Sequence, residues 1–378
     1  MYDLSDHRSM VSDEVRIAAY ARAIREVVRP DDVVLDLGCG IGILSVLAAR
    51  AGARRVYAVD PTDSVHYARR VVVENQVADR VVVVRGRIED VTLPERPTLI
   101  VGDVRGPLPL DAGGASAWEA ARRILAPNGR TIPRKDVVYA QPISSRDLHG
   151  QVHAFGPVAG VSFDALRTPL ANTRHEEPAD AVPLAGEMPL FEIVYGAPPP
   201  ARYEGTAEFV ALHAGSVDAF RVGFEADLAP GISYRSFGPG RARAYGVHVL
   251  STPRRIDLAA GTRLSLRVVA DVVDTTTQVT WAVDVDGTDG AWQGALVEAA
   301  QSLDVVRAGL SDHVPGADPA DDLDAVILAE FRKGKTIGDA TAAAMGAMPA
   351  VPPERVEIRV VELSRRRQGR VVRRIGGA

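Results

Sequence analysis

The stretch VVLDLGCGIGILSVLAARAGARRVYAVD, residues 33–60, decides the fold of this chain. Its first apolar run ends at Asp36, and its second apolar run ends at Asp60. Three glycines follow the first run at alternate positions: Gly38, Gly40 and Gly42. An apolar segment of helical length, residues 43–50, separates the glycines from the second run. The pattern predicts strand, glycine turn, helix and strand, the unit that opens a parallel α/β sheet.

This turn predicts a nucleoside site, because glycines let the backbone approach a ligand where a Cβ would collide. Asp60 stands where an acidic side chain can bind a ribose diol. The dinucleotide pattern is G-x-G-x-x-G, whereas this chain reads D-x-G-x-G-x-G. Asp36 would repel a pyrophosphate but could hold an ammonium group, directly or through water. The turn therefore favours S-adenosylmethionine over NAD or FAD; glycines that serve tight packing alone are the alternative.

Length and composition limit the classes of protein to which this chain can belong. With 378 residues, 46% of them hydrophobic, the chain can bury a large core and should form two or three domains. The net charge of -5 gives no general argument for nucleic-acid binding. The single cysteine, Cys39, excludes a disulfide framework and fits a reducing compartment. The acidic N-terminus is unlike a signal peptide, and no run approaches about 18 apolar residues. We expect a cytoplasmic protein with no membrane span and no metal site.

A second motif precedes the glycine turn. Residues 1–28 predict a helix closed by Pro30, and within it MVSDEVR, residues 10–16, is followed by Tyr20. Together with residues 33–60, this motif strongly resembles the type I protein arginine methyltransferases, whose helix carries M-x-x-D-x-V-R-T-x-x-Y. Ile17 replaces the threonine. The resemblance implies a class I methyltransferase that uses S-adenosylmethionine and releases S-adenosylhomocysteine.

The resemblance also implies a cofactor-binding set. Arg16 would pair with the carboxylate of the methionine moiety, a contact worth about 1.5–3 kcal/mol. Ile88 would pack on the adenine and Glu89 would accept a hydrogen bond from its amino group; an ordinary acidic loop is the alternative. Met10 would lie beside the methyl acceptor or fill the core, and His7 would face the cofactor or solvent. The full set is His7, Met10, Arg16, Asp36, Gly38, Cys39, Gly40, Asp60, Pro61, Ile88 and Glu89.

The acceptor motifs depart from the family. The family has S-E-W-M-G-Y and a second glutamate some nine residues on, and the two carboxylates clamp a guanidinium. Here residues 102–111 read GDVRGPLPLD, so Asp103 takes the first position and Asp111 lies close to the second, with one residue fewer between them. A shorter aspartate would loosen such a clamp by about an ångström. Arg105 stands where the family has methionine; facing the pocket it would oppose a cationic acceptor, and facing solvent it would matter little.

A second departure lies later in the chain. The Thr-His-Trp loop of the family aligns with Ala244-Tyr245-Gly246. Tyr245 could hydrogen-bond an acceptor, and His248 could replace the missing histidine. The candidate catalytic residues are Asp103, Asp111, Arg105, Tyr245 and His248.

The fold we expect is an α/β Rossmann-like methyltransferase domain, an antiparallel β-barrel and a small C-terminal α+β module resembling a winged helix. The expected segments are a cofactor-covering helix (1–30), the cofactor domain (31–133), the barrel for substrate binding and dimerisation (134–300) and the C-terminal module (312–378). Residues 161–178 resemble the arm through which family members dimerise; a surface loop is the alternative. The module could be a structural appendage, recruit a peptide by β-strand addition, or contact phosphates through its arginines.

We therefore expect methyl transfer to a nitrogen, with arginine in a protein or peptide as the leading acceptor, including a peptide natural product. A small-molecule N- or O-methyltransferase of natural-product biosynthesis and a non-catalytic binding protein remain as alternatives. Nucleic acid and membranes are not expected partners.

Overall fold

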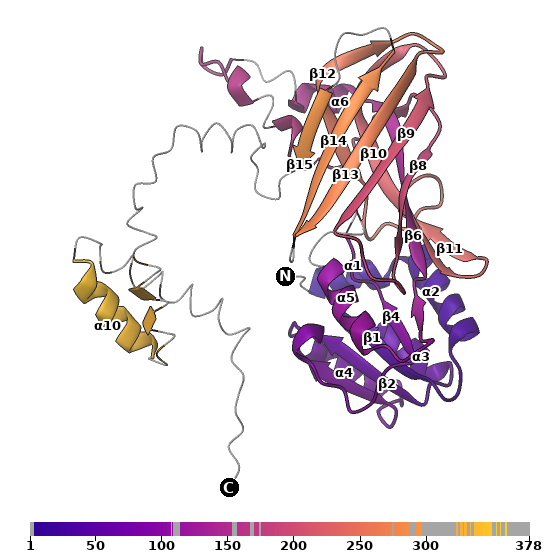
Figure 1. Cartoon of the computed structure of the whole chain (residues 1–378), viewed down its shortest axis with the longest axis vertical. Coiled ribbons are helices and arrows are strands. Elements are labelled where there is room, and N and C mark those ends of the chain that lie inside the picture. Colours follow the sequence, from indigo (N-terminus) through magenta and orange to yellow (C-terminus); the bar gives the residue numbers. More distant parts are fainter. Residues whose placement is uncertain are drawn as a thin grey trace. The chain divides into compact units, whose positions relative to one another are not determined.

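The computed structural model describes residues 4–106, 108, 114–152, 157–166, 170–173, 175–273, 276–286 and 292–296, and in the C-terminal part residues 323, 326–327, 329–330, 333, 336–349, 353, 356 and 360. The chain divides into two compact units, Met1–Val306 and Arg307–Ala378. The first unit contains a parallel and an antiparallel region (Figure 1). Asp111 and the arginine-rich residues 365–374 lie outside the described residues.

The parallel region is a five-stranded sheet in the order β3-β2-β1-β4-β5. Its strands are β1 (Val33–Leu37), β2 (Arg55–Asp60), β3 (Val81–Arg85), β4 (Leu99–Gly102) and β5 (Arg130–Ile132). Its helices are α3 (Ile43–Arg50), α4 (Val65–Glu74) and α5 (Gly114–Ile124), with the short 3-10 helix η1 (Ile88–Asp90) after β3. Every residue of β1 is buried, as its apolar run predicts for the centre of a parallel sheet. The strand order reverses between β1 and β4, the place where open parallel sheets bind ligands.

The expected N-terminal helix is two helices, α1 (Leu4–Val11) and α2 (Glu14–Val27). The break falls at Asp13, whose Oδ1 accepts a hydrogen bond of 3.3 Å from the backbone N–H of Arg16. An aspartate that caps the second helix in this way stops the first from continuing. The other oxygen, Oδ2, accepts hydrogen bonds from the backbone N–H groups of Arg243 and Ala244, at 2.6 and 2.9 Å. Asp13 thus starts α2 and ties it to the loop before β12.

The antiparallel region has two sheets. The first contains β6 (Lys135–Ser144), β7 (Val182–Pro183), β8 (Met188–Val194), β10 (Gly215–Ala229), β11 (Ile232–Arg235) and β12 (His248–Leu258). The second runs β15 (Trp292–Leu296), β14 (Thr276–Val285), β13 (Arg263–Val273), β9 (Arg202–Val210). The connections carry α6 (Arg146–Val152) and the 3-10 helix η2 (Asp164–Leu166).

The two sheets pack through large apolar side chains. The rings of Phe209 in β9 and Phe220 in β10 lie 5.9 Å apart, and both residues are buried. The expected antiparallel β domain after the parallel region is confirmed. The apolar side of α2 belongs to a separate core cluster that includes residues of both regions, and in it the rings of Tyr20 and Tyr234 lie 6.1 Å apart. The parallel and antiparallel regions therefore share buried side chains around α2.

The second unit contains α10 (Ile337–Ala347). Its N-cap is Thr336, which forms a capping box with Asp339: each side chain accepts a hydrogen bond from the other residue's backbone N–H. Six buried residues form one apolar cluster: Leu323, Ile327, Ala340, Ala344, Val356 and Val360. Four of these residues lie outside α10, and each of the four is helical. Residues 361–378 of the expected C-terminal module lie outside the described residues.

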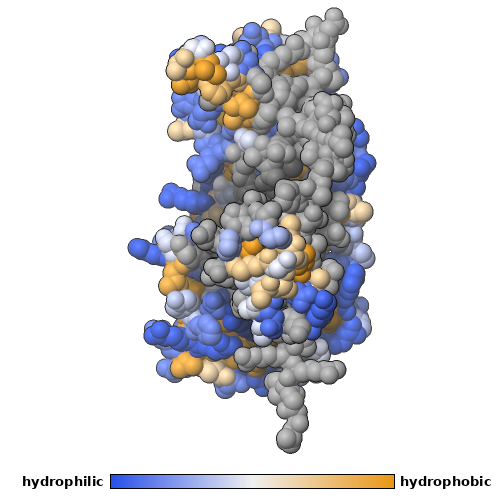
Figure 2. All heavy atoms as spheres, turned by 90° about the vertical axis from the view of Figure 1, so that its left-hand side faces the viewer, coloured by the Kyte–Doolittle hydropathy of each residue, from blue (hydrophilic) through white to orange (hydrophobic). Residues whose placement is uncertain are grey.

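The described helices include none long and apolar enough to cross a membrane. On the face shown in Figure 2, hydrophobic residues form small patches separated by hydrophilic ones.

Candidate functional site

The glycine turn after β1 has the backbone that only glycine adopts readily. Gly38, Gly40 and Gly42 have φ of 69°, 52° and 89°. A Cβ on Gly38 would lie 2.5 Å from Cγ2 of Val104, and one on Gly40 would lie 3.1 Å from the His7 ring. His7 in α1 is therefore placed over the turn, and the turn leaves no room for side chains of its own.

Asp60 at the end of β2 fixes the turn from the other side. Its Oδ2 accepts a hydrogen bond of 3.0 Å from the backbone N–H of Gly40. Its Oδ1 accepts hydrogen bonds from the hydroxyls of Thr62 and Ser64, at 2.6 and 3.2 Å. Thr62 and Ser64 were not expected from the sequence as site residues, although hydroxyl side chains two and four positions after a strand-end acid are a recognisable signal.

Asp36, at the carboxyl end of β1, is buried beneath the turn. The hydroxyl of Ser45 donates to its Oδ2 at 2.5 Å, while Oδ1 has no hydrogen-bond partner within the described part of the protein. Burial raises the pKa of Asp36 to about 7, although the hydrogen bonds from Ser45 oppose the rise. A buried carboxylate oxygen without a donor is costly unless a ligand supplies one. The geometry fits a cationic group bound next to β1.

A cleft lies at the carboxyl ends of these strands. Its volume is about 340 Å³, which is within the range of small-molecule sites. Of the residues expected to bind cofactor, four line it: Gly38, Pro61, Ile88 and Glu89. Cys39 is buried, and burial raises the pKa of its thiol well above the ordinary value, so that the side chain acts as a small apolar group.

Arg16 of α2 meets Asp103, the residue that follows β4, in a buried ion pair. Nη2 of Arg16 donates to the backbone carbonyl of Met10 at 2.5 Å. The hydroxyl of Tyr20 donates to Oδ1 of Asp103 at 3.1 Å. Burial alone would raise the pKa of Asp103, but the charges of Arg16 and Arg105 outweigh it and lower the pKa below the ordinary value. Asp103 is therefore ionised at neutral pH.

Arg105 does not face solvent. Only 4% of the residue is exposed, and its Nε lies 3.1 Å from Oδ1 of Asp103. Its Nη1 donates to both carboxylate oxygens of Asp136, at 2.7 and 2.8 Å, and its Nη2 donates to the hydroxyl of Tyr20 at 2.8 Å. The guanidinium thus reaches two carboxylates and one hydroxyl.

Aromatic rings surround the same guanidinium. Its central carbon lies 5.2 Å from the ring centre of Phe224, 5.7 Å from that of Tyr195 and 6.0 Å from that of Tyr234. Rings at such distances attract a cation that has lost its water.

Asp136, in β6, is a site residue that the sequence analysis missed. It is fully buried, and the hydroxyl of Tyr195 donates to its Oδ2 at 2.5 Å. Burial raises its pKa to about 6, with Arg105 and Tyr195 opposing the rise. A signal was present, because Asp136, Val138 and Ala140 alternate on the buried face of one strand. An acidic residue at a position that faces the core indicates that it has a buried partner.

Tyr245 contacts the same site, and its hydroxyl donates to the backbone carbonyl of Asp103 at 3.3 Å. Burial raises the pKa of Tyr245 well above the ordinary value, so its hydroxyl keeps its proton. His248 is buried in β12, opposite Val222 of β10 in the sheet. Of the five expected catalytic residues, the structure thus brings Asp103, Arg105 and Tyr245 together.

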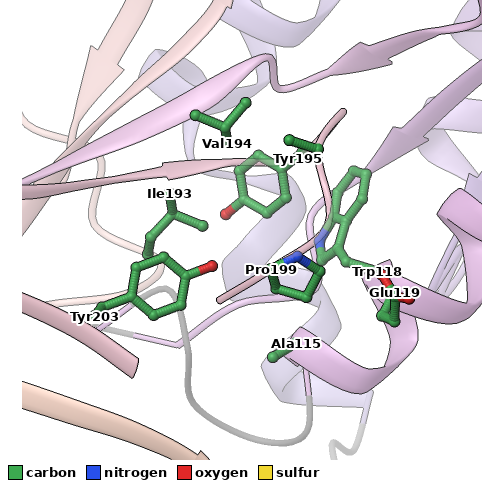
Figure 3. Close-up of a pocket in the computed structure, with 9 residues that line it drawn as sticks. Ala115, Trp118, Glu119, Ile193, Val194, Tyr195, Pro199 and Tyr203 are labelled. Carbon is green, nitrogen blue, oxygen red and sulfur yellow. The ribbon is translucent and has the colours of Figure 1, made fainter. Parts of the chain in front are cut away.

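A second hollow lies between α5 and the strands β8 and β9 (Figure 3). Figure 3 shows the Trp118 and Tyr195 rings next to each other, with Tyr203 across the hollow; the first two ring centres lie 4.4 Å apart. Burial raises the pKa of Tyr203 to about 12. The hydroxyl of Tyr195 connects this hollow to Asp136 and the buried charges.

The part of the chain that the structure describes holds no group of three or more His, Cys, Asp or Glu residues placed to bind a metal ion.

The fold matches solved protein arginine methyltransferase structures. A *Trypanosoma brucei* PRMT1 enzyme-prozyme heterotetrameric complex with AdoHcy aligns with a TM-score of 0.71, covering 77% of this chain and 96% of that chain at 21% identity. *Arabidopsis thaliana* protein arginine methyltransferase 10 aligns with a TM-score of 0.65, covering 78% and 97% at 22% identity. The chain therefore has the fold of these proteins: a parallel α/β sheet followed by an antiparallel domain.

Sequence similarity indicates the same relatives. The chain is 35% identical over 177 residues to a probable protein arginine N-methyltransferase 6 of *Arabidopsis thaliana*, over 46% of this chain and 41% of the relative. It is 39% identical over 151 residues to protein arginine N-methyltransferase 2 of *Dictyostelium discoideum*, over 39% and 30%. The model of the ribosomal protein L11 methyltransferase (PrmA) family matches residues 20–102. The matched segments span less than half the length of these relatives.

Proposed function

We propose that this chain is an S-adenosylmethionine-dependent methyltransferase that methylates a nitrogen of arginine in a protein or peptide. The observation that carries the proposal is the set of charged side chains at the carboxyl ends of β1 and β4. Asp36 of β1 lies opposite Val101 of β4, two residues before Asp103, and Asp103 pairs with Arg16. The cationic and anionic side chains there complement a ligand that carries both an ammonium and a carboxylate. The resemblance to protein arginine methyltransferases gives the acceptor.

The residues of the cleft fit this cofactor. Oδ1 of Asp36 is the buried acceptor that lacks a donor, and an amino-acid ammonium would supply one. Arg16 would hold the carboxylate, and Ile88 and Glu89 line the cleft where a base would bind. Gly38 of the glycine turn also lines the cleft, and Asp60 holds this turn through the backbone N–H of Gly40. When bound, S-adenosylmethionine supplies an electrophilic methyl group on a sulfonium.

Asp103 is the acceptor-side residue of the proposal. It is buried and ionised, and an ionised carboxylate in a dry site binds a guanidinium by charge-assisted hydrogen bonds. The hydroxyls of Tyr20 and Tyr245 fix the side chain and backbone of Asp103, at 3.1 and 3.3 Å. Orientation of the acceptor nitrogen by fixed groups accounts for much of the rate in such a transfer.

A small neutral acceptor is the second candidate, and Arg105 is the observation that favours it. Arg105 is buried beside Asp103, and its positive charge opposes a cationic acceptor at that point.

Self-association is a further part of the proposal. Three exposed apolar residues lie at the start of the expected arm or just before it: Val158, Val161 and Leu166, with exposed fractions of 60, 56 and 42%. Exposed apolar side chains on a short segment favour a protein interface. Replacing Val158 and Val161 by aspartate should reduce the molar mass in light scattering from dimer to monomer; an unchanged mass would exclude this segment.

The test of the function begins with calorimetric titration of the purified chain with S-adenosylmethionine and S-adenosylhomocysteine. Mass spectrometry of free arginine, arginine peptides and cell extract incubated with the enzyme follows. Micromolar binding and a gain of one methyl on arginine are the expected results. Methylation of another compound only would support the small-molecule candidate, and the absence of cofactor binding would contradict both.

A further inference from the structure

The buried guanidinium of Arg105 lies among two carboxylates, a hydroxyl and three aromatic rings. Its Nη1 donates hydrogen bonds to Asp136 and its Nη2 donates one to the hydroxyl of Tyr20, whereas its Nε meets Asp103 in an ion-pair contact that is not a hydrogen bond. Each of its three nitrogens therefore has a polar contact, while aromatic rings surround the carbon. A planar, delocalised cation is the chemical group that such a site accepts best.

We propose that Asp103 and Asp136 together bind the guanidinium of the acceptor, and that Arg105 occupies this two-aspartate site until the acceptor displaces it. The inference rests on the proposed function and deepens it. It assigns the second carboxylate to β6, at a position far in sequence from Asp111.

The two-aspartate site lies next to the residues that we assign to the cofactor, because Asp103 belongs to both. One of its oxygens, Oδ2, pairs with Arg16, which we assign to the cofactor, and the other, Oδ1, faces Arg105. A group that replaced Arg105 would therefore share a carboxylate with the residue that binds the cofactor. The acceptor must lie against the cofactor for transfer, and this adjacency meets that requirement.

Charge balance makes Arg105 and an acceptor competitors. Arg16 and Arg105 supply two positive charges to the two aspartates, so the buried cluster is neutral when both aspartates are ionised. A second guanidinium beside Arg105 would add an unpaired cation to a dry site, which is strongly unfavourable. An arginine acceptor gains both carboxylates only when Arg105 withdraws.

The experiment replaces Arg105 by methionine, a linear side chain without charge, and uses ethylguanidine as the probe. The probe is used at concentrations on the order of 1–50 mM, because so small a ligand binds weakly. In R105M it should raise the melting temperature and give a saturable calorimetric signal. The matched control is R105M/D136N, in which no aspartate at position 136 remains to bind the probe; its response should fall at least about tenfold. If R105M folds only when ethylguanidine is present, this requirement shows that ethylguanidine binds the folded protein.

The second measurement asks whether the bound probe is a methyl acceptor. With methyl-labelled S-adenosylmethionine, R105M should transfer label to ethylguanidine. The guanidine nitrogen forms a bond to the methyl carbon as the sulfonium C–S bond breaks, and one N–H proton leaves to solvent. R105M should also methylate an arginine peptide at least about tenfold faster than wild type, because the competitor is gone.

The outcomes separate this inference from the proposed function. Binding and labelling of ethylguanidine in R105M support the inference. Binding without labelling, in a variant that still binds cofactor, would show that Arg105 is structural and overturn it, as would the absence of binding in a folded R105M. If wild type does not bind cofactor, the proposed function fails, whereas the ethylguanidine titration still decides whether a two-aspartate guanidinium site exists.

Discussion

Arg105 and Asp136 form a fully buried ion pair in which one nitrogen, Nη1, contacts both carboxylate oxygens, at 2.7 and 2.8 Å. Arg105 follows the parallel strand β4, and Asp136 begins the antiparallel strand β6. The pair therefore links the parallel and antiparallel regions of the first unit by an ion pair. Both groups are buried, so water solvates neither of them.

Removing one member of this pair should destabilise the first unit more than removing both. R105M leaves Asp136 buried without its cation, and we expect a loss of about 3–5 kcal/mol in the free energy of unfolding. R105M/D136N leaves no unpaired charge and should recover at least half of that loss. Urea unfolding of wild type, both single variants and the double variant measures the coupling. Equal losses in the single and double variants would contradict it.

Asp36 should make stability and cofactor affinity depend on pH. Its folded pKa of about 7 lies above the unfolded value of about 3.9, so the folded state binds its proton more tightly. The resulting stabilisation is complete below about pH 4 and is lost as the pH rises through 7, by at most about 1.4 kcal/mol per unit. Wild type should therefore lose more unfolding free energy than D36N between pH 5 and 8.

The cofactor should show the opposite trend, because an ammonium needs the ionised form of Asp36. Affinity for S-adenosylhomocysteine should rise from pH 6 to 8 in wild type and stay nearly flat in D36N. Urea unfolding and calorimetry across this range measure both effects, with D63N, a change at an exposed aspartate, as control. Parallel curves for wild type and D36N would show that Asp36 does not titrate there.

Local patterns were sufficient to predict most of the parallel region. Residues 43–50 were expected as a helix and form α3 with the same bounds, because a glycine turn and an apolar run define its start. The single helix expected over residues 1–28 was wrong, because Asp13 caps a second helix there. The signal was a lone aspartate followed by a glutamate, which also occurs inside helices.

Contacts between residues that are far apart in the sequence were harder to predict. The sequence left open whether Arg105 faces the pocket or the solvent. Its partner Asp136 lies on a strand of the antiparallel region, and only the fold shows that the two residues are neighbours. Short strands were also missed, such as β7 (Val182–Pro183) and β11 (Ile232–Arg235), because pairing with neighbours rather than periodicity defines them. Alternation along β6 indicated that Asp136 is buried, but only the fold shows what it pairs with.

Replacing Asp103 by asparagine should remove turnover and keep the cofactor site. The amide keeps the shape of the carboxylate but loses the charge that would hold a guanidinium, so kcat should fall at least about 100-fold. Affinity for S-adenosylhomocysteine should stay within a few-fold, because the cofactor carboxylate offers Arg16 another partner. Single-turnover assays and calorimetry separate the two effects, with D31N at an exposed site as control. Turnover close to that of wild type would remove Asp103 from the transfer.

The glycine turn offers a test in which backbone strain is matched. Gly38 and Gly52 both have positive φ, 69° and 104°, so alanine strains either position. A Cβ at Gly38 would lie 2.5 Å from Val104, which lines the cleft, whereas a Cβ at Gly52 meets no atom within 4 Å. Backbone strain should cost each variant about 1–2 kcal/mol of stability, and G38A should lose more because its Cβ collides with Val104. Only G38A should lose cofactor affinity, by at least about tenfold. Calorimetry with S-adenosylhomocysteine decides, since equal affinities in the two variants would show that the space above Gly38 is not where the cofactor binds.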